Sequence, residues 1–441
     1  MKPILTSIAA SSLFAALAMA QPRYTVRDLG TLGGTYSFGF GINSAGDVAG
    51  AAATAVQTDG FAATAFLWSK QKGITPLGLL GPPLFPACPT CNSGGAGVGA
   101  LGEVAMGSEI ATLDPNGEDF GQWEGPFLPP THRVTRGAIW RNGVMTALST
   151  LPGGNNTNVF WINNLGQVSG NAENAIPDSS CSIVTPFQVR RFQPVIWGAN
   201  GEIQRVLSPL AGDTVAFALT INDQGQTVGG SGLCSTIGLP PFAIPNTTAA
   251  HAVLWEKDGS IRYLGSLGGG VDIANSINNR GEVLGGGLSP KDGTIHAFLW
   301  TRQTGMLDYG AFPGAVATVV GCCHTNNDRG EIVGFSVEPD NPYFGRALIW
   351  QGAEPRDLNA FVRDPGPFVH LTGAFSINDA GEIVCQGVTN TGELHACLAV
   401  PNNGAKPAES VSPATRQLGS HMPLSDNARE LLRRRFGIRG R

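Results

Sequence analysis

Charged side chains are scarce in this chain, because only 14% of its 441 residues are Asp, Glu, Lys or Arg. Few charges, together with 61 glycines and 30 prolines, favour an all-β protein with many short strands over a helical one. The glycines form no phosphate-binding loop in a strand–helix context, and no Gly-x-Ser-x-Gly motif is present. These absences leave no sequence signal for nucleotide binding or for a serine hydrolase.

Long apolar runs are also missing beyond the N-terminus, so no later stretch predicts a membrane span. The N-terminus itself has Lys2, then a short apolar run over residues 4–17, then Ala18-Met19-Ala20, a small-x-small cleavage site. This order predicts a secretory signal peptide over residues 1–20. We therefore expect an exported protein that is extracellular, periplasmic or held at the cell surface.

Charge is unevenly distributed along the chain. Residues 402–441 carry eight Lys or Arg and three Asp or Glu, which predicts a linker followed by a short basic tail. The whole chain has a net charge of −5, so the segment 21–401 is acidic. An acidic body argues against nucleic acid as a partner, because nucleic-acid binding depends on neutralising phosphates.

One phrase recurs seven times along the chain, for example in Ser276 to Gly286, SINNRGEVLGG. Its core is an Asn-x-x-Gly turn followed by a short apolar strand, a sequence typical of a tight hairpin. The turn glycines are Gly46, Gly102, Gly166, Gly225, Gly281, Gly330 and Gly381. The turn asparagines are Asn43, Asn163, Asn222, Asn278, Asn327 and Asn378, with Gly99 in the second copy.

The spacing of the phrase predicts the architecture. Repeats of about 50 residues with four strands each match β-propeller blades better than solenoid coils, whose periods are shorter. Seven copies predict seven four-stranded blades over residues 21–401. The last copy lacks its final strand, and the chain begins with a matching one near Tyr24, so we expect the N-terminal strand to close the propeller.

The repeated phrases resemble the HAF repeat family of probable extracellular repeat proteins. The resemblance rests on the DLGTLGG sequence at 28–34, on Ile-Asn-x-x-Gly-x-Val-x-Gly, and on His-Ala-Phe-Leu-Trp at 296–300. It covers roughly residues 24–400 and implies an exported bacterial repeat protein. It implies no particular activity and no catalytic residues. The second and sixth copies depart from the pattern, with Val98-Gly99 and Asn326-Asn327 in place of Ile-Asn.

All eight cysteines lie in the part predicted to be exported, where an oxidising compartment favours disulfides. Cys385 and Cys397 each lie six residues from Thr391, the centre of a predicted hairpin turn, so we expect them to pair across two antiparallel strands. The other predicted pairs are Cys88–Cys91, Cys181–Cys234 and the adjacent Cys322–Cys323.

The connections between strands differ at the two faces of the predicted propeller. The Asn-x-x-Gly turns lie at one face, and the variable segments 81–96, 107–135, 171–192 and 230–250 lie at the other. Long loops on a rigid scaffold often carry binding residues. Within 107–135, aromatic side chains alternate with carboxylates, a combination that suits a sugar ligand or simply packs the loop on the blade below. The candidate residues are Glu118, Asp119, Phe120, Trp123, Glu124 and Phe127.

The recurring histidines, His251, His296 and His395, do not predict a metal site. The same position holds Thr64, Arg136, Gln193 and Arg346 in other copies, which indicates a structural hydrogen-bonding position. We predict no metal, cofactor or catalytic residue, and we expect a monomer. The favoured function is a non-catalytic scaffold that binds glycan or protein ligands. The alternatives are a polysaccharide-active enzyme with carboxylates near the central channel, or a purely structural surface protein.

Overall fold

The computed structural model describes residues 24–55, 63–82, 84–118, 120, 131–181, 188–237, 248–321, 324–339 and 345–402. Nearly all regular structure in these residues is β-strand. The short 3-10 helix η3 (Leu358–Phe361) is an addition near the last blade. No helix in this part of the chain is long and apolar enough to cross a membrane. The predicted signal peptide and basic tail fall outside the described residues, apart from Asn402.

The chain folds as a β-propeller, as the repeat predicts. The described strands pair into three four-stranded sheets, one eight-stranded sheet and one nine-stranded sheet, and for reference we divide them by antiparallel pairing into groups of four called blades 1 to 7. Parallel contacts of β2 with β29 and of β20 with β22 join neighbouring groups in the larger sheets. Blade 1 contains β2 (Gly33–Ile42), β3 (Val48–Thr54), β4 (Ala63–Ser69) and β5 (Gly73–Gly78). Blade 2 contains β6 (Ser93–Val98), β7 (Val104–Leu113), β8 (Arg133–Arg141) and β9 (Val144–Ala147). Blade 3 contains β10 (Thr157–Ile162), β11 (Val168–Pro177), β12 (Arg190–Trp197) and β13 (Ile203–Val206).

The remaining blades follow the same antiparallel order. Blade 4 contains β14 (Val215–Ile221), β15 (Thr227–Gly232), β16 (His251–Trp255) and β17 (Ile261–Tyr263). Blade 5 contains β18 (Asp272–Ile277), β19 (Val283–Leu288), β20 (Ile295–Thr301) and β21 (Gly305–Asp308). Blade 6 contains β22 (Ala317–Val319), β23 (Val333–Val337), β24 (Ala347–Gln351) and β25 (Glu354–Asp357). Blade 7 contains β27 (Phe368–Ile377), β28 (Ile383–Thr389), β29 (Leu394–Pro401) and the N-terminal β1 (Tyr24–Asp28).

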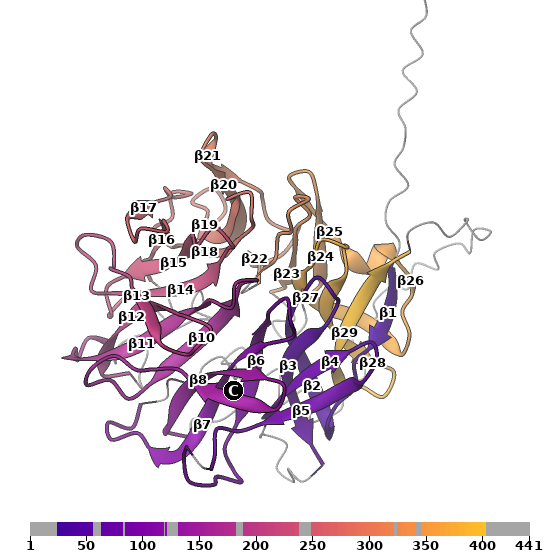
Figure 1. Ribbon diagram of the computed structural model, residues 1–441. Coiled ribbons are helices and arrows are strands. Elements are labelled where there is room, and N and C mark those ends of the chain that lie inside the picture. The colour runs from indigo at the N-terminus through magenta and orange to yellow at the C-terminus, as the bar shows by residue number, and fades with distance from the viewer. Residues whose placement is uncertain are drawn as a thin grey trace, which may run out of the picture.

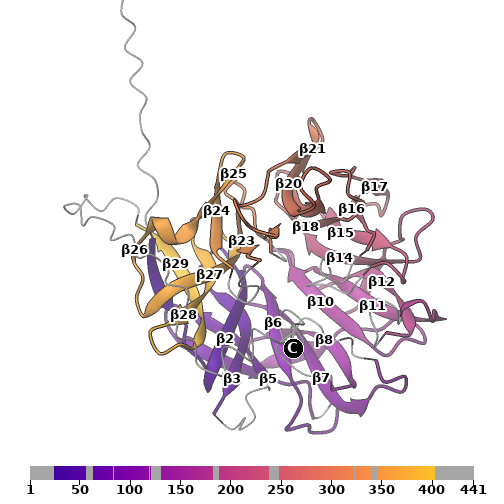
Figure 2. The same cartoon turned by 180° about the vertical axis from the view of Figure 1, so that it is seen from behind.

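The blades lie side by side around a centre, with the first strand of each blade innermost (Figures 1 and 2). The predicted closure by the N-terminal strand is confirmed, because β1 pairs antiparallel with β29 from Tyr24 opposite Pro401 to Asp28 opposite Cys397. A further strand, β26 (Val362–Asp364), pairs parallel with the outer edge of β1. The first strand of the chain is thus held between two segments from its far end.

The turn asparagines form a hydrogen-bond ring around the centre of the propeller. In each case the side-chain Nδ2 donates to the backbone oxygen of the equivalent residue in the next blade, at 2.9 to 3.0 Å. The donors are Asn43, Asn163, Asn222, Asn278, Asn327 and Asn378. The ring closes across the ends of the chain, because Asn378 of blade 7 donates to Asn43 of blade 1, 335 residues away. Blade 2 only accepts, through the oxygen of Gly99, so the ring has no such bond from blade 2 to blade 3.

The same amides also shape their own turns. In blade 7, Asn378 Oδ1 accepts hydrogen bonds from the backbone N–H groups of Ala380 at 3.1 Å and Glu382 at 3.0 Å. Its Nδ2 also reaches the carboxylate of Glu382 at 2.8 Å. Equivalent side-chain contacts occur at Gln167, Gln226, Glu282 and Glu331. The acidic or amide residue after each turn glycine is therefore a structural partner of the asparagine.

A bulge in the innermost strand explains the second glycine of the repeated phrase. In blade 3 the pairing of β10 with β11 shifts between Val159 and Trp161, and Gly170 lies opposite. A Cβ at Gly170 would lie 2.0 Å from the backbone oxygen of Asn158. Gly229 of blade 4 has the same close approach to Phe217, at 1.9 Å. Only glycine fits at these positions, because the bulge brings the neighbouring backbone into the space of a side chain.

The recurring tryptophans link neighbouring blades. Trp197 and Trp255 are fully buried, and each indole N–H donates at 2.8 Å to a carbonyl of the preceding inter-blade connection, at Ser149 and Ser208. Trp350 donates to Tyr309 at 3.4 Å. Each indole thus adds apolar area and one satisfied polar contact at a blade boundary.

Removal of one ring asparagine should destabilise the whole fold. Asn378→Ala leaves the buried oxygen of Asn43 and two N–H groups of its own turn without partners. We expect a loss of about 3 kcal/mol in the free energy of unfolding, measured by urea denaturation. The control is Asn200→Ala in an exposed turn, for which we expect about 0.5 kcal/mol or less. Equal losses in the two variants would contradict the structural role of the ring.

The contact between β1 and β29 should make stability depend on acid pH. The Asp28 carboxylate accepts from His395 Nδ1 at 2.9 Å. Burial raises the pKa of Asp28, but the hydrogen bonds from His395 and the Gly30 N–H outweigh burial and hold the pKa below its usual value. Ionised Asp28 therefore stabilises the fold above its unfolded pKa of about 4, and this stabilisation disappears as pH falls through the folded pKa.

We accordingly expect Asp28→Asn to melt at a lower temperature than the unmodified chain at pH 7. The difference should shrink towards pH 3, because the unmodified chain also loses its carboxylate there. Scanning calorimetry at pH 7, 5 and 3 checks this expectation. A difference in melting temperature that stays constant over this range would show that Asp28 stabilises the fold through its packing and not through its charge.

Candidate functional site

The face opposite the hydrogen-bond ring carries the long connections of blades 2, 3 and 4. These connections are 114–132, 178–189 and 233–250, and we call them the blade 2, blade 3 and blade 4 insertions. The equivalent connections of blades 5, 6 and 7 are 289–294, 338–346 and 390–393. The insertions are shorter than the sequence predicts because β7 and β11 continue to Leu113 and Pro177 before the chain turns.

Glu118 joins the blade 2 insertion to the blade 3 insertion. Its side chain is fully buried, and Oε1 accepts from the backbone N–H groups of Val189 at 2.6 Å and Arg190 at 2.8 Å. The same oxygen accepts from Gln188 Nε2 at 3.2 Å. The prediction that Glu118 presents its carboxylate to a sugar is therefore wrong, because backbone donors of the next blade already occupy that oxygen.

Phe120 is also buried rather than displayed on the loop face. It belongs to the apolar cluster of blades 3 and 4 and meets Phe192 edge to face, with ring centroids 6.4 Å apart. Of the two alternatives that the sequence leaves open, Phe120 follows packing on the neighbouring blade, since a buried phenyl ring has no free face for a sugar. The other candidates, Asp119, Trp123, Glu124 and Phe127, lie outside the described residues.

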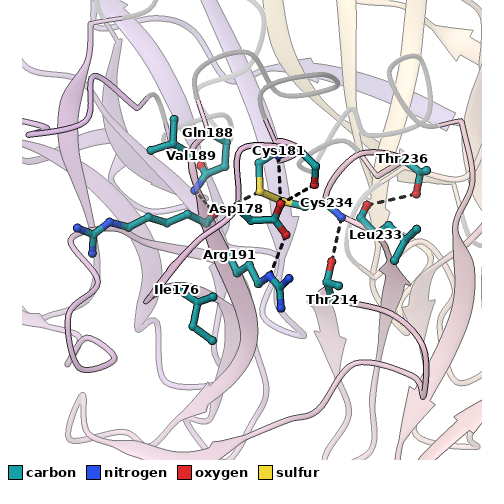
Figure 3. Close-up of a disulfide and its surroundings, with 12 residues drawn as sticks. Ile176, Asp178, Cys181, Gln188, Val189, Arg191, Thr214, Leu233, Cys234 and Thr236 are labelled. Atoms are coloured by element: carbon teal, nitrogen blue, oxygen red, sulfur yellow. Dashed lines mark hydrogen bonds and ion pairs between the residues drawn. A yellow bond between two sulfur atoms is a disulfide. The ribbon is translucent and has the colours of Figure 1, made fainter.

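A disulfide joins the blade 3 insertion to the blade 4 insertion (Figure 3). Cys181 and Cys234 are bonded, as predicted, and both are buried in the same apolar cluster as Phe120. On one side, Cys181 N–H donates to the Asp178 backbone oxygen at 3.0 Å. On the other side, Cys234 N–H donates to Thr214 Oγ1 at 3.1 Å. The cross-link is therefore anchored in both blades, and the described parts of the three insertions are connected through Glu118 and this disulfide; we call these parts the insertion layer.

Two other predicted disulfides are confirmed, Cys88–Cys91 and Cys385–Cys397. The second pair connects directly opposed residues of β28 and β29, as the hairpin geometry predicts. Cys322 and Cys323 lie outside the described residues. The confirmed pairs are compatible with an oxidising compartment.

Sequence reasoning missed a group of buried acids beneath the blade 2 insertion. Asp114, Glu118 and Glu173 are all buried, and each offers an oxygen within 4.8 Å of those of the others. Asn156 Nδ2 spans two of them, at 2.9 Å from Asp114 Oδ2 and 3.5 Å from Glu173 Oε2. Part of the signal is visible in the sequence Asp-Pro-Asn-Gly-Glu at 114–118, an oxygen-rich turn. Glu173 carries no such signal, because it lies in a strand 55 residues after Glu118.

The electrostatics of this acidic group are unusual. Burial, a shared hydrogen bond with Glu118, and the negative charges of Glu118 and Asp114 all raise the pKa of Glu173 well above its usual range. The Arg136 guanidinium is the opposing charge nearby, and burial lowers the pKa of Arg136. At neutral pH the Glu173 carboxyl therefore holds a proton when only protein groups surround it.

The recurrent histidines act as hydrogen-bonding groups, as their variable sequence position predicts. His251 Nδ1 lies 2.9 Å from Asp213, and His296 Nδ1 lies 2.8 Å from Asp308. Arg346, in the same position of blade 6, pairs with Asp357 at 3.2 Å. In every case the partner carboxylate lies in a neighbouring strand or connection, so the position ties strands together.

Aromatic side chains pack between innermost strands of different blades. Trp161 of β10 stacks on the imidazole of His324, with ring centroids 4.9 Å apart and planes within 10°. A Cβ at Gly41 would lie 2.9 Å from the Trp161 indole, and one at Gly97 would lie 3.1 Å from it. Burial lowers the pKa of His324, so the imidazole is neutral at pH 7 and its Nδ1 lies 3.0 Å from the oxygen of Ile377.

Carboxylates near the ring of turns serve the contacts between blades. Asp328 accepts from the backbone N–H of Asn279 at 2.7 Å, and Asp223 accepts from that of Asn164 at 2.9 Å. Asp379 accepts from the N–H of Asp328 at 2.9 Å. These acids hold adjacent turns in register, and the observed contacts assign them no reaction.

Comparison with protein-family models and with curated protein sequences gave no match. Solved structures with a similar fold include the β-propeller domain of the Trilobed protease from Pyrococcus furiosus, at 11% identity and a TM-score of 0.47. That similarity covers 87% of this chain and 99% of the other. Puromycin hydrolase is 11% identical with a TM-score of 0.48, over 82% of this chain.

A gluconolactonase from Xanthomonas campestris, XC5397, is 11% identical with a TM-score of 0.35, and 86% of this chain and 94% of that one are covered. The chain spans about half the length of puromycin hydrolase, 51%. Similarity at this level concerns the fold alone and carries no activity across. The similarity to HAF repeat proteins remains a prediction.

The disulfide in the insertion layer should contribute strongly to stability. It closes a long segment, because its cysteines are 53 positions apart in the sequence, whereas Cys88 and Cys91 are three positions apart. Loop-closure entropy predicts that Cys181→Ser with Cys234→Ser costs about 4 kcal/mol, against about 2 kcal/mol for the corresponding change at Cys88 and Cys91. Hydrogen exchange of the blade 3 and blade 4 insertions should accelerate only in the first variant. Unchanged exchange there would contradict a connected layer.

Proposed function

We propose that this protein is an exported, non-catalytic scaffold that binds a ligand through the layer formed by the blade 2, 3 and 4 insertions. The observation that carries the proposal is the connection of these insertions to one another, through Glu118 and through the disulfide. Connected loops lose little conformational entropy when a ligand binds, so they suit recognition. The predicted signal peptide and the disulfides support export.

Exposed aliphatic side chains on this layer support a binding role. Leu113 is 63% exposed, Ile176 50% and Leu233 41%, and Figure 3 shows the last two on either side of the disulfide. Exposed apolar side chains near one another commonly mark contact surfaces. They favour a protein ligand, whereas a glycan ligand would use the aromatic segment around Trp123.

The test compares variants of the two faces. Ile176→Asp with Leu233→Asp alters the insertion layer, and Leu165→Asp alters a leucine in a turn on the opposite face that is more exposed than either, at 65%. The purified chain is incubated with isolated cell envelopes and with a panel of polysaccharides, and retained protein and released reducing ends are both measured. We expect the first variant to lose retention at least tenfold and the second to keep it, without release of reducing ends.

Pretreatment of the envelopes distinguishes the ligand classes. Loss of retention after protease treatment identifies a protein ligand, and loss after periodate oxidation identifies a glycan. Equal retention of both variants would contradict binding through the insertion layer. Release of reducing ends by the unmodified chain would replace the scaffold with the polysaccharide-active enzyme.

A further inference from the structure

We propose that Asp114, Glu118 and Glu173 bind one calcium ion at the junction of blades 2 and 3. The site is separate from the exposed surface of the insertion layer, and the proposal does not depend on the ligand of that surface. It concerns buried groups, since all three carboxylates are at most 6% exposed.

The geometry of the three carboxylates suits one ion. Their ligand oxygens lie within 4.8 Å of one another. Calcium binds oxygens at about 2.4 Å, so two of its ligands lie up to about 5 Å apart. The acids come from two segments that the fold holds firmly: Asp114 and Glu118 flank a tight turn, closed by the bond from Glu118 N–H to Asp114 Oδ1 at 3.1 Å, while Glu173 belongs to β11.

A second observation comes from oxygens that lack partners. Glu173 Oε1 is buried and receives no hydrogen bond from an N–H or amide donor of the described residues, since its contact with Glu118 joins two carboxyl groups. Gln188 is only 1% exposed, and its Oε1 is likewise unpaired within the described chain. The Gln188 amide lies directly against the cluster, because its Nε2 is 3.2 Å from Glu118 Oε1. A buried acceptor without a partner costs about 1 to 3 kcal/mol, and a cation bound among the carboxylates would satisfy Glu173 Oε1.

Charge also favours a cation. Three carboxylates lie together in a buried place, with the Arg136 guanidinium as the opposing charge close to Glu173. Buried like charges are costly unless a positive partner compensates them. A divalent ion bound among the three acids would supply that charge.

The ligand set selects calcium among common metals. Every donor is a carboxylate or amide oxygen, without the imidazole or thiolate that zinc and copper prefer. The site is buried and enclosed by protein, whereas magnesium keeps several waters and demands near-octahedral geometry. Calcium accepts irregular arrangements of six to eight oxygens, some of them from water.

Calcium binding is first measured on the full, unmodified chain after removal of metals with a chelator. Isothermal titration should show one equivalent of calcium bound. Hydrogen exchange should slow on calcium addition at 114–118, 171–173 and 188–190. This measurement needs no variant, so it stands even if a substitution prevents folding. No calcium binding at millimolar concentration, or no protection at these segments, would overturn the proposal.

The variant Glu173→Gln separates a metal site from a merely structural acid pair. Without calcium, its stability should equal or exceed that of the unmodified chain, because an amide can donate to Glu118. With calcium, the rise in melting temperature seen in the unmodified chain should vanish, and affinity should fall roughly tenfold or more. The control is Glu202→Gln at an exposed turn of blade 3, which should keep the calcium response.

Other outcomes decide against the site. Undiminished calcium affinity in Glu173→Gln would place the ion elsewhere. A stabilising response to magnesium but not to calcium would overturn the choice of metal. Equal loss of stability by Glu173→Gln with and without calcium would make the acids a structural pair that shares a proton.

Discussion

The hydrogen bond from each turn asparagine to the next blade is the interaction on which the fold depends. It is short, buried and repeated, and it returns from blade 7 to blade 1. Because the amide fixes its own turn and the neighbouring one together, it sets both the hairpin and the angle between blades. The hydrogen bonds of the ring do not depend on the length of the connections on the opposite face. Connections there vary from 390–393 in blade 7 to 114–132 in blade 2 without disturbing the centre.

On the opposite face, a different set of contacts holds the long connections in place. Backbone donors of blade 3 converge on Glu118, and a disulfide continues the connection to blade 4. Buried polar groups gather at the same junction, including Asn158 and Asn171, directly opposite each other on β10 and β11 with amide atoms that lack partners among the described residues. Such groups are costly in a core built for stability alone. Between blades 2 and 3, therefore, buried polar groups depart from the usual pattern in which each one has a hydrogen-bond partner.

Much of the fold can be predicted from the sequence, because the same sequence pattern, and therefore the same local structure, recurs in each blade. The turn glycines, the missing last strand and the spacing of Cys385 and Cys397 each imply a local geometry that the structure contains. The acidic group could not be predicted, since Glu173 is brought to Asp114 only when two blades pack. For a related reason, the sugar-binding interpretation of Phe120 and Glu118 does not hold. Their composition suits a ligand surface, but whether a loop side chain faces solvent or the next blade depends on contacts that are distant in sequence.

The pairing of β1 with β29 also imposes an order on how the chain is made. Tyr24 leaves the ribosome long before its partner Pro401, which belongs to the last of the described strands. At ordinary rates of about 5 to 20 residues per second, the first strand waits for roughly 20 to 75 seconds. During that time its edge is open to any other chain that offers a strand. The shortness of β1, five residues, limits this hazard, so the segment that finally closes the molecule is also one that is poor at pairing prematurely.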